Sequence, residues 1–396
     1  MKKLLLHIGT PKTGSSSIQA TCYQAADAEL KPALYIPPNP FMTPTPCGFV
    51  AALYNAFDNL PRGLRSRYFH DQEAFHKDVG AYRALMMDRI AGSDALILSS
   101  EYMTSFGSES VRRFAEDVQS LGVEEVQVVI YVRDPAGMYL SAIQQRLRAS
   151  HRFYRPENFH YQFRRAIERW SAVYPGKILV RPFDRSQLPD GCVVRDFLSI
   201  ASEFLEVDAS KLHPIRMNES MSAEGCFIMQ KYREYFHATA ADIFKPDSDS
   251  ILELIAAYQN TFDVTKLKLQ PWAKEEVLRR HQEDLKWLEE TWRVRFEGIP
   301  LSAEKENDPG GSGNEVPFRL EDIVEPCRQD VLEQLLYRIL HEFSSVTAQK
   351  LLEKNEKLKE LKRKNADLKQ KTEDYRAKLK KSERRNRGIL GWLRRR

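Results

Sequence analysis

Short apolar runs alternate with segments of helical periodicity over the first half of the chain. Each run is rich in Leu, Ile or Val and has the length of a buried strand. The runs occupy residues 3–8, 95–100, 126–132 and 177–183. Strands that alternate with helices predict an α/β fold, in which helices cover both faces of a parallel sheet.

The first run leads into a turn that suits an anion. Residues 3–8 are followed by a turn from Gly9 to Gly14, and a helical pattern begins at Ser15. Gly14 lets the backbone approach an anion closely, and the first N–H groups of the helix point toward it. Lys12 supplies a full positive charge. The sequence predicts a strand, a phosphate loop and a helix, although a generic anion nest or a tight turn would have the same pattern.

The loop is not a Walker A sequence, because its lysine precedes the second glycine. Its order Pro-Lys-Thr-Gly-Ser-Ser-Ser resembles the 5′-phosphosulfate loop of sulfotransferases that use 3′-phosphoadenosine 5′-phosphosulfate (PAPS). The family more often has threonines at the positions of Ser15 and Ser16. The resemblance implies a P-loop-type sheet and PAPS as co-substrate. The cofactor-binding residues that it implies here are Lys12, Thr13, Gly14, Ser15, Ser16 and Ser17.

A second pattern of the same family follows the third apolar run. Arg133 comes directly after the strand, and Ser141 stands eight positions later on a helix that Asp134 and Pro135 are expected to start. The family's 3′-phosphate site has this arginine and serine. An Arg–Asp turn pair with an ordinary helix serine is the alternative. Arg216 stands where the family often places further 3′-phosphate ligands. The resemblance covers about residues 3–220.

Glu101 follows the second apolar run and is the candidate general base. Carbohydrate-directed members of the family use a glutamate, and Ser-Ser-Glu at residues 99–101 looks like that type. A carboxylate beside the anions of the cofactor should have a raised pKa, which helps it accept a proton. A glutamate that caps the next helix is the alternative. Lys12 is expected to stabilise charge on the bridging oxygen. No metal is required, because the sulfuryl group carries only one negative charge.

These residues lead to one functional hypothesis with two rivals. The resemblance implies an enzyme that transfers the sulfuryl group of PAPS to a hydroxyl of a carbohydrate or glycoconjugate acceptor. A nucleotide kinase of the P-loop class is the first rival, and strict dependence on Mg²⁺ and ATP would favour it. A non-catalytic scaffold, with a coiled coil and a degenerate nucleotide domain, is the second rival.

The net charge of +5 conceals a division along the chain. From residue 350 to the end, Lys and Arg outnumber Asp and Glu by twelve, so the remainder is acidic. Residues 351–379 have a heptad pattern, which predicts either a coiled-coil homodimer or a solvated single helix. The end of the chain, 386–396, is a basic tail that either contacts anionic lipid or is disordered. Nucleic acid is not an expected partner.

The expected organisation has four parts. Residues 1–300 form the sulfotransferase-like α/β domain, with a helical insertion after about residue 220. A linker at 301–316 contains Asp-Pro-Gly-Gly-Ser-Gly, 317–385 is a helical segment with the coiled coil, and 386–396 is the tail. No apolar run has the length of a membrane span, and no signal cleavage site is evident. We expect a cytoplasmic protein, with peripheral contact at the inner face of the membrane as a variant.

Overall fold

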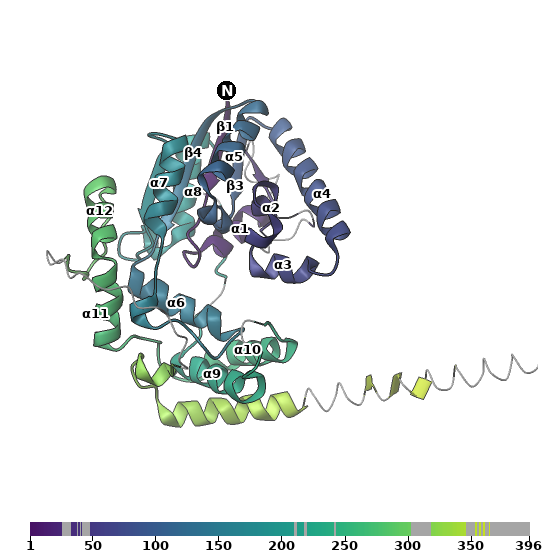
Figure 1. Cartoon of the computed structure of the whole chain (residues 1–396), viewed down its shortest axis with the longest axis vertical. Coiled ribbons are helices and arrows are strands. Elements are labelled where there is room, and N and C mark those ends of the chain that lie inside the picture. The colour runs from purple at the N-terminus through teal and green to yellow at the C-terminus, as the bar shows by residue number, and fades with distance from the viewer. Residues whose placement is uncertain are drawn as a thin grey trace, which may run out of the picture.

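A five-stranded sheet with all its strands parallel forms the centre of the computed structural model (Figure 1). The structure describes residues 1–25, 33–37, 39, 41, 48–209, 212–217, 220–240, 243–301, 318–345 and single positions between 353 and 364. The strand order is β2-β3-β1-β4-β5, with β1 (Lys2–His7), β2 (Ala33–Ile36), β3 (Ala95–Ser99), β4 (Val123–Val132) and β5 (Ile178–Pro182). The predicted α/β class and parallel sheet are confirmed.

Strand β2 is the one strand among the described residues that the sequence did not predict. The segment from 20 to 90 reads as mostly helical, whereas Ala33–Ile36 pairs with β3 at the edge of the sheet. This strand has only four residues, too few to display a period. Its conformation is stabilised by hydrogen bonds to β3, which is distant in sequence.

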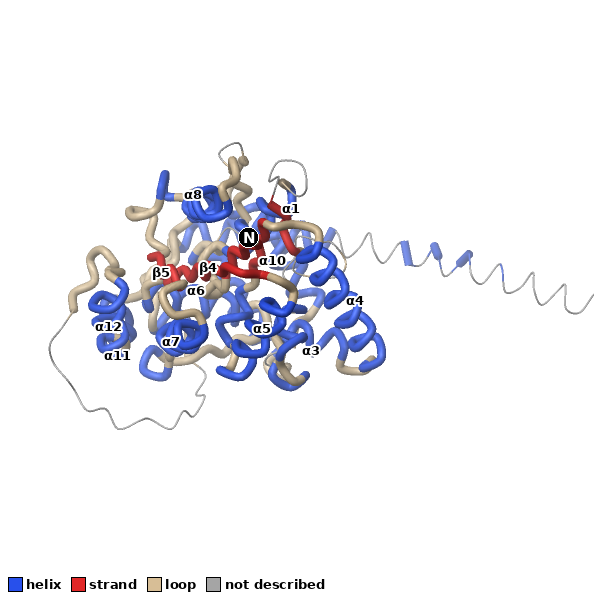
Figure 2. Tube along the Cα trace, turned by 90° about the horizontal axis from the view of Figure 1, so that it is seen from above, coloured by secondary structure: helices blue, strands red, loops and turns tan. Residues whose placement is uncertain are grey.

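Helices cover both faces of the sheet. Figure 2 shows α1 (Ser15–Gln24) and α8 (Val193–Leu205) on one side of the strands, and α5 (Ser108–Ser120) and α7 (Phe163–Val173) on the other. Leu4 and Leu6 join the core under α5 and α7, while Leu5 joins the core under α1 and α8. The helices α2 (Phe49–Tyr54), α3 (Arg62–Tyr68) and α4 (Gln72–Ala91) extend the layer formed by α5 and α7.

The carboxyl ends of the strands meet at one edge, and the strand order reverses at β1. Ligands of open α/β sheets bind at such an edge. Helix α6 (Pro135–Leu147) lies there (Figure 1). Asp134 caps it as predicted, because its Oδ1 accepts a 2.7 Å hydrogen bond from the N–H of Gly137. Pro135 is the first helical residue.

The second half of the described chain is helical, as predicted after about residue 220. It contains α9 (Ala223–His237), α10 (Pro246–Gln259), α11 (Pro271–Arg280), α12 (Gln282–Trp292) and a further helix at 329–345. Within the segment from 317 that was expected to be helical, Leu320–Asp322 form a 3₁₀ helix and the α-helix begins only at 329, since Val324 forms an antiparallel bridge with Leu269. None of the described helices is long and apolar enough to cross a membrane.

Three of the expected segments lie outside the described residues, in whole or in large part. They are the linker at 301–316, of which only Leu301 is described, the heptad positions at 351–379, of which a few are described, and the tail at 386–396. These expectations stay predictions.

Candidate functional site

The turn between β1 and α1, here called the 9–14 loop, begins as an extension of the sheet. Tyr131 of β4 donates its N–H to the carbonyl of Gly9 at 2.8 Å, and accepts the N–H of Thr10 at 2.9 Å. Gly9 also lies against the backbone of Glu101, since a Cβ at Gly9 would stand 2.9 Å from its Cα. The loop is therefore held between the ends of β4 and β3 before it turns into α1.

Gly14 begins α1 in a conformation that only glycine adopts easily. Its φ is +82°, in the left-handed region. A Cβ at this position would also lie 2.5 Å from Cγ1 of Val193 on α8. Both the backbone conformation and the packing of α8 therefore require glycine here.

The first turn of α1 presents backbone donors at the mouth of the loop. The carbonyl of Gly14 accepts the N–H groups of Ser17 and Ile18, at 2.9 and 3.1 Å. The N–H groups of Ser15 and Ser16 precede them, and no intrahelical carbonyl is available to either. The Thr13 hydroxyl is buried and donates to the carbonyl of Thr10 at 2.5 Å. Thr13 therefore braces the loop through its side chain, while Ser15 and Ser16 offer their backbone N–H groups.

Lys12 lies in the loop with its ammonium group toward α6. Its Nζ donates to Oε1 of Gln145 at 2.6 Å, and its φ of +65° is unusual for a residue other than glycine. A left-handed conformation costs about 1–2 kcal/mol for such residues and is often found at functional sites. Loss of hydration lowers the pKa of Lys12, the charge of Glu101 raises it, and Arg148 and Arg133 lower it.

The structure brings Arg133 and Ser141 together. Nη1 of Arg133 donates to Oγ of Ser141 at 2.6 Å and to the carbonyl of Lys12 at 3.3 Å. The guanidinium lies over the ring of Phe183, 5.6 Å from its centroid. Burial lowers the pKa of Arg133, and Asp134 opposes this effect. This cation therefore joins the end of β4, the first half of α6 and the 9–14 loop.

Glu101 stands at the carboxyl end of β3 and begins a 3₁₀ helix, Glu101–Ser105. Burial raises the pKa of Glu101 above its ordinary value. A hydrogen bond from Ser15 and the charge of Lys12 oppose this increase only in part. The N-cap residue of this short helix is Ser100, and no side chain, that of Glu101 included, makes a capping hydrogen bond. The carboxylate of Glu101 therefore faces the loop lysine and the first serine of α1.

Arg216 lies beside the first turns of α1. The N–H of Met217 donates to Oγ of Ser17 and the N–H of Ile215 donates to Oγ1 of Thr21, both at 3.0 Å. Arg216 stands between these two anchors, and its side chain is exposed. The structure thus brings this segment to α1, although the two are about two hundred residues apart in sequence.

Sequence reasoning missed Tyr161, which contacts both the 9–14 loop and Arg133. Its hydroxyl lies 2.5 Å from Oγ1 of Thr10 and 3.4 Å from the N–H of Arg133, which donates to it. Burial raises the pKa of Tyr161 to about 12, so the hydroxyl stays protonated. Its own N–H donates to Nε2 of His281. No pattern in the sequence links residue 161 to the loop.

Sequence reasoning also missed Gln145 and Arg148. Residues 141 and 145 of α6 and its C-cap residue, 148, are spaced by four and three positions, so they lie on one side of the helix. Ser141 had been singled out, and this spacing could have indicated the other two. Arg148 is exposed and close enough to lower the pKa of Lys12.

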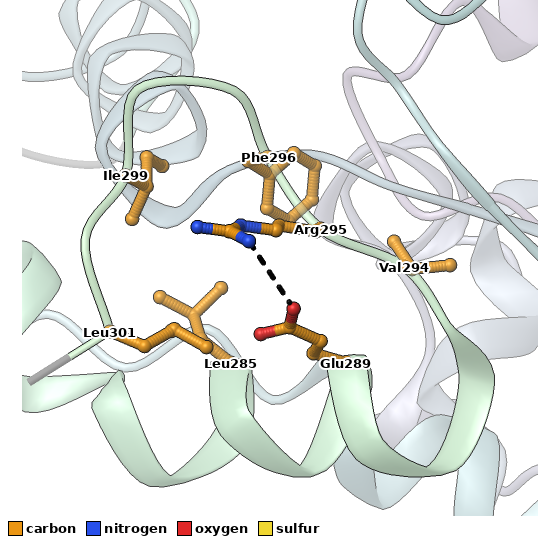
Figure 3. A pocket seen from close by; sticks show the side chains of 7 residues that line it. All are labelled: Leu285, Glu289, Val294, Arg295, Phe296, Ile299 and Leu301. Carbon is orange, nitrogen blue, oxygen red and sulfur yellow. Dashed lines mark ion pairs between the residues drawn. The ribbon is translucent and has the colours of Figure 1, made fainter. Parts of the chain in front are cut away.

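Two further observations concern other places on the molecule where a ligand or a metal ion could bind. Figure 3 shows a hollow at the end of α12, where Arg295 pairs with Glu289 at 3.6 Å. Its volume of about 10 Å³ holds at most one water molecule, so it is no ligand site. Within the described part of the chain, no three His, Cys, Asp or Glu residues are grouped so that they could hold a metal ion.

The geometry defines a class of site: a cationic loop at a helix start, with one half-buried carboxylate beside it. Helix N-termini bind anions, and perturbed pKa values cluster at functional sites, so this edge of the sheet is the candidate functional site. No family model and no curated protein matches this chain.

Proposed function

We propose that this protein is a PAPS-dependent sulfotransferase of the P-loop type that acts on a hydroxyl group. The observation that carries the proposal is the contact of Arg133 with both Ser141 and the carbonyl of Lys12, at 2.6 and 3.3 Å. It connects two candidate anion sites, the 9–14 loop and the start of α6, across a short distance. A nucleotide with phosphates on both its 3′ and 5′ oxygens needs two such sites.

The donor set is suited to such a nucleotide. The backbone N–H groups of Ser15 and Ser16 and the ammonium of Lys12 would hold the 5′-phosphosulfate. Arg133 would hold the 3′-phosphate through charge-assisted hydrogen bonds, with the hydroxyl of Ser141 beside it. Arg216, exposed beside α1 where Met217 bonds to Ser17, would supply a further cation for the nucleotide.

The residues have distinct roles in the proposed transfer. Bound PAPS supplies the sulfuryl group. Lys12 neutralises the negative charge that develops on the bridging oxygen of the leaving phosphate. Glu101 accepts the proton of the acceptor hydroxyl, and its raised pKa brings it closer to the operating pH. Such general-base assistance contributes a factor of ~10²–10⁴ in rate.

The acceptor and the location belong to the same proposal. A glutamate base favours a carbohydrate or glycoconjugate acceptor over a small aromatic one, because carbohydrate-directed relatives of the resembled family use a glutamate. We place the reaction in the cytoplasm, with the basic tail as a candidate contact for anionic lipid at the inner face of the membrane.

Binding of adenosine 3′,5′-bisphosphate, the expected product, is the direct test. Isothermal calorimetry on the full chain should give metal-independent binding in the micromolar range. Arg133→Ala should weaken this binding at least ten-fold, because hydrogen bonds to charged groups contribute about 1.5–3 kcal/mol each. Arg165→Ala is the matched control, since Arg165 is an exposed arginine on α7.

Two results would overturn the proposal. If only ATP with Mg²⁺ bound, a kinase would replace it. If neither nucleotide bound, or if Arg133→Ala and Arg165→Ala behaved alike, the loop and α6 would not form one nucleotide site.

A further inference from the structure

Arg148, at the end of α6, is an exposed arginine beside the candidate site. It makes no hydrogen bond, ion pair or ring contact with any residue that the structure describes. Arg146, two positions earlier, is engaged instead. Its Nε donates to the carbonyl of Arg152 at 3.3 Å, and its guanidinium lies over the ring of Tyr154. Arg148 is therefore available to a ligand, whereas Arg146 supports the fold.

The backbone at Arg148 is fixed by the residues that follow it. The N–H groups of Ala149 and Ser150 both donate to the carbonyl of Arg146, at 3.0 and 2.8 Å. The carbonyl of Ala149 accepts a hydrogen bond from Arg233, which is fully buried on α9. The end of α6 thus presents Arg148 from an anchored backbone, and its side chain alone has to adjust to a ligand.

The charge of Arg148 acts on the loop lysine. Burial is the largest cause that lowers the pKa of Lys12. Among the neighbouring charges, Glu101 raises this pKa, while Arg148 and Arg133 lower it. The effect of Arg148 is larger than that of Arg133, although Arg133 bonds to the carbonyl of Lys12. The ammonium therefore lies near one carboxylate and two other cations, and this excess of positive charge attracts anions.

Three side chains of α6 mark successive positions along the candidate site. Ser141 meets Arg133, and Gln145 meets the ammonium of Lys12. At about 1.5 Å per residue, Gln145 is about 6 Å beyond Ser141 along the helix, and Arg148 is about 4.5 Å beyond Gln145. In a group transfer of this kind the attacking and leaving oxygens are in line, so the acceptor approaches from the side away from the nucleotide. Arg148 lies at that end of the row, farthest from the candidate 3′-phosphate site.

We propose that Arg148 binds a carboxylate of the acceptor, so that the acceptor is an acidic carbohydrate with a uronic acid beside the hydroxyl that receives the sulfuryl group. This proposal rests on the proposed sulfotransferase function. The planar guanidinium forms two parallel hydrogen bonds with a carboxylate. An anionic acceptor is repelled by the negative charge of the sulfuryl group, and the cation of Arg148 offsets this repulsion. A neutral carbohydrate would leave Arg148 without a partner.

The test compares matched pairs of acceptors. Hexasaccharides that contain glucuronate, galacturonate or mannuronate are each paired with the carboxyl-reduced form, in which a neutral hydroxymethyl group replaces the carboxylate. Transfer of labelled sulfate from PAPS by the full chain should favour at least one acidic member over its neutral form by about ten-fold or more in kcat/KM. Arg148→Gln should abolish this preference by raising KM for the acidic member about ten-fold or more, while kcat stays within about two-fold.

Three comparisons separate this role from a role in folding or in nucleotide binding. Arg148→Lys keeps the charge without the planar fork and should retain part of the preference. Arg165→Gln, at an exposed arginine on α7, should behave as wild type. All three variants should bind adenosine 3′,5′-bisphosphate and unfold thermally as wild type does.

The outcomes distinguish this proposal from the function on which it rests. Wild type that binds adenosine 3′,5′-bisphosphate but sulfates neutral and acidic members equally, or sulfates no acidic member, would overturn the role of Arg148 alone. An equal effect of Arg148→Gln on both forms would overturn it as well. Wild type that does not bind this nucleotide would overturn the proposed function and the role of Arg148 with it.

Discussion

The ammonium of Lys12 donates a 2.6 Å hydrogen bond to Oε1 of Gln145 and so joins the 9–14 loop to α6. The same helix carries Ser141, the partner of Arg133, one turn earlier. Two cations of the candidate site are thus oriented by two polar side chains on one helical face. Gln145 is a positioning residue in this arrangement, because it acts through Lys12.

Gln145→Leu should slow sulfuryl transfer while leaving nucleotide affinity within about two-fold. The ammonium loses a charge-assisted hydrogen bond of about 1.5–3 kcal/mol, so its orientation is no longer fixed. Release of labelled sulfate from PAPS to water should fall about ten-fold or more. Gln145→Glu keeps an acceptor for Lys12 and should retain more activity than the leucine variant. Equal rates in the leucine variant and wild type would exclude the positioning role.

The rate of transfer should depend on the ionisation of Glu101. The base must be deprotonated, so the rate should fall as the pH is lowered through its pKa, which burial raises above the ordinary value. Glu101→Gln should lose this acid limb and ~10²–10⁴ of the rate, yet bind adenosine 3′,5′-bisphosphate as well as wild type. A pH–rate profile of both proteins measures this. An unchanged limb in the variant would assign it to another group.

The same substitution should stabilise the protein at neutral pH. A carboxyl whose folded-state pKa is raised binds its proton more tightly when folded, so stability declines as pH rises from the unfolded to the folded pKa. Glutamine has no such dependence. Urea unfolding at acidic and neutral pH should show the advantage of Glu101→Gln growing as the pH increases. A constant difference across that range would mean that Glu101 titrates alike in both states.

Gly14→Ala should destabilise the fold and weaken nucleotide binding together. The left-handed φ costs about 1–2 kcal/mol for a residue with a Cβ, and the contact with Val193 adds an overpacking cost of about 1–3 kcal/mol. Adding Val193→Ala should recover only the second part. Gly80→Ala, in the middle of α4 with no atom within 4 Å of the new Cβ, is the control and should be neutral or stabilising. Thermal unfolding of wild type, Gly14→Ala, the double variant with Val193→Ala, and Gly80→Ala gives the four melting temperatures to compare.

Tyr161→Phe should loosen the loop without changing the core volume greatly. It removes a hydroxyl that contacts Thr10 and the N–H of Arg133, a loss of about 0.5–1.5 kcal/mol for each hydrogen bond. The two losses together amount to about 1–3 kcal/mol, so affinity for adenosine 3′,5′-bisphosphate should fall roughly five- to 150-fold, since 1.4 kcal/mol is about ten-fold in affinity. Tyr154→Phe is the comparison, because Tyr154 is 52% exposed. Similar affinities of the two variants would show that Tyr161 has no influence on the loop.

Local patterns in the sequence were sufficient to predict most of the alternating strands and helices. The apolar runs predicted four of the five strands, and Asp134 with Pro135 predicted the start of α6. These features depend on residues close together along the chain. They include helical periodicity, the N-cap of a first turn and the backbone conformations open to Gly14. The eight-residue spacing of Arg133 and Ser141 likewise belongs to one strand and helix, and the two side chains meet.

Contacts between distant segments required the tertiary structure. Strand β2 is stabilised by β3, Tyr161 reaches Thr10 across about a hundred and fifty residues, and Gln145 meets Lys12 only because α6 lies at the carboxyl edge of the sheet. The raised pKa of Glu101 is of the same kind, because it depends on burial and not on the residue type. The sequence by itself determined which segments are strands and helices and where cations and a carboxylate follow them. The packing of the helices decided which of those charges share one site.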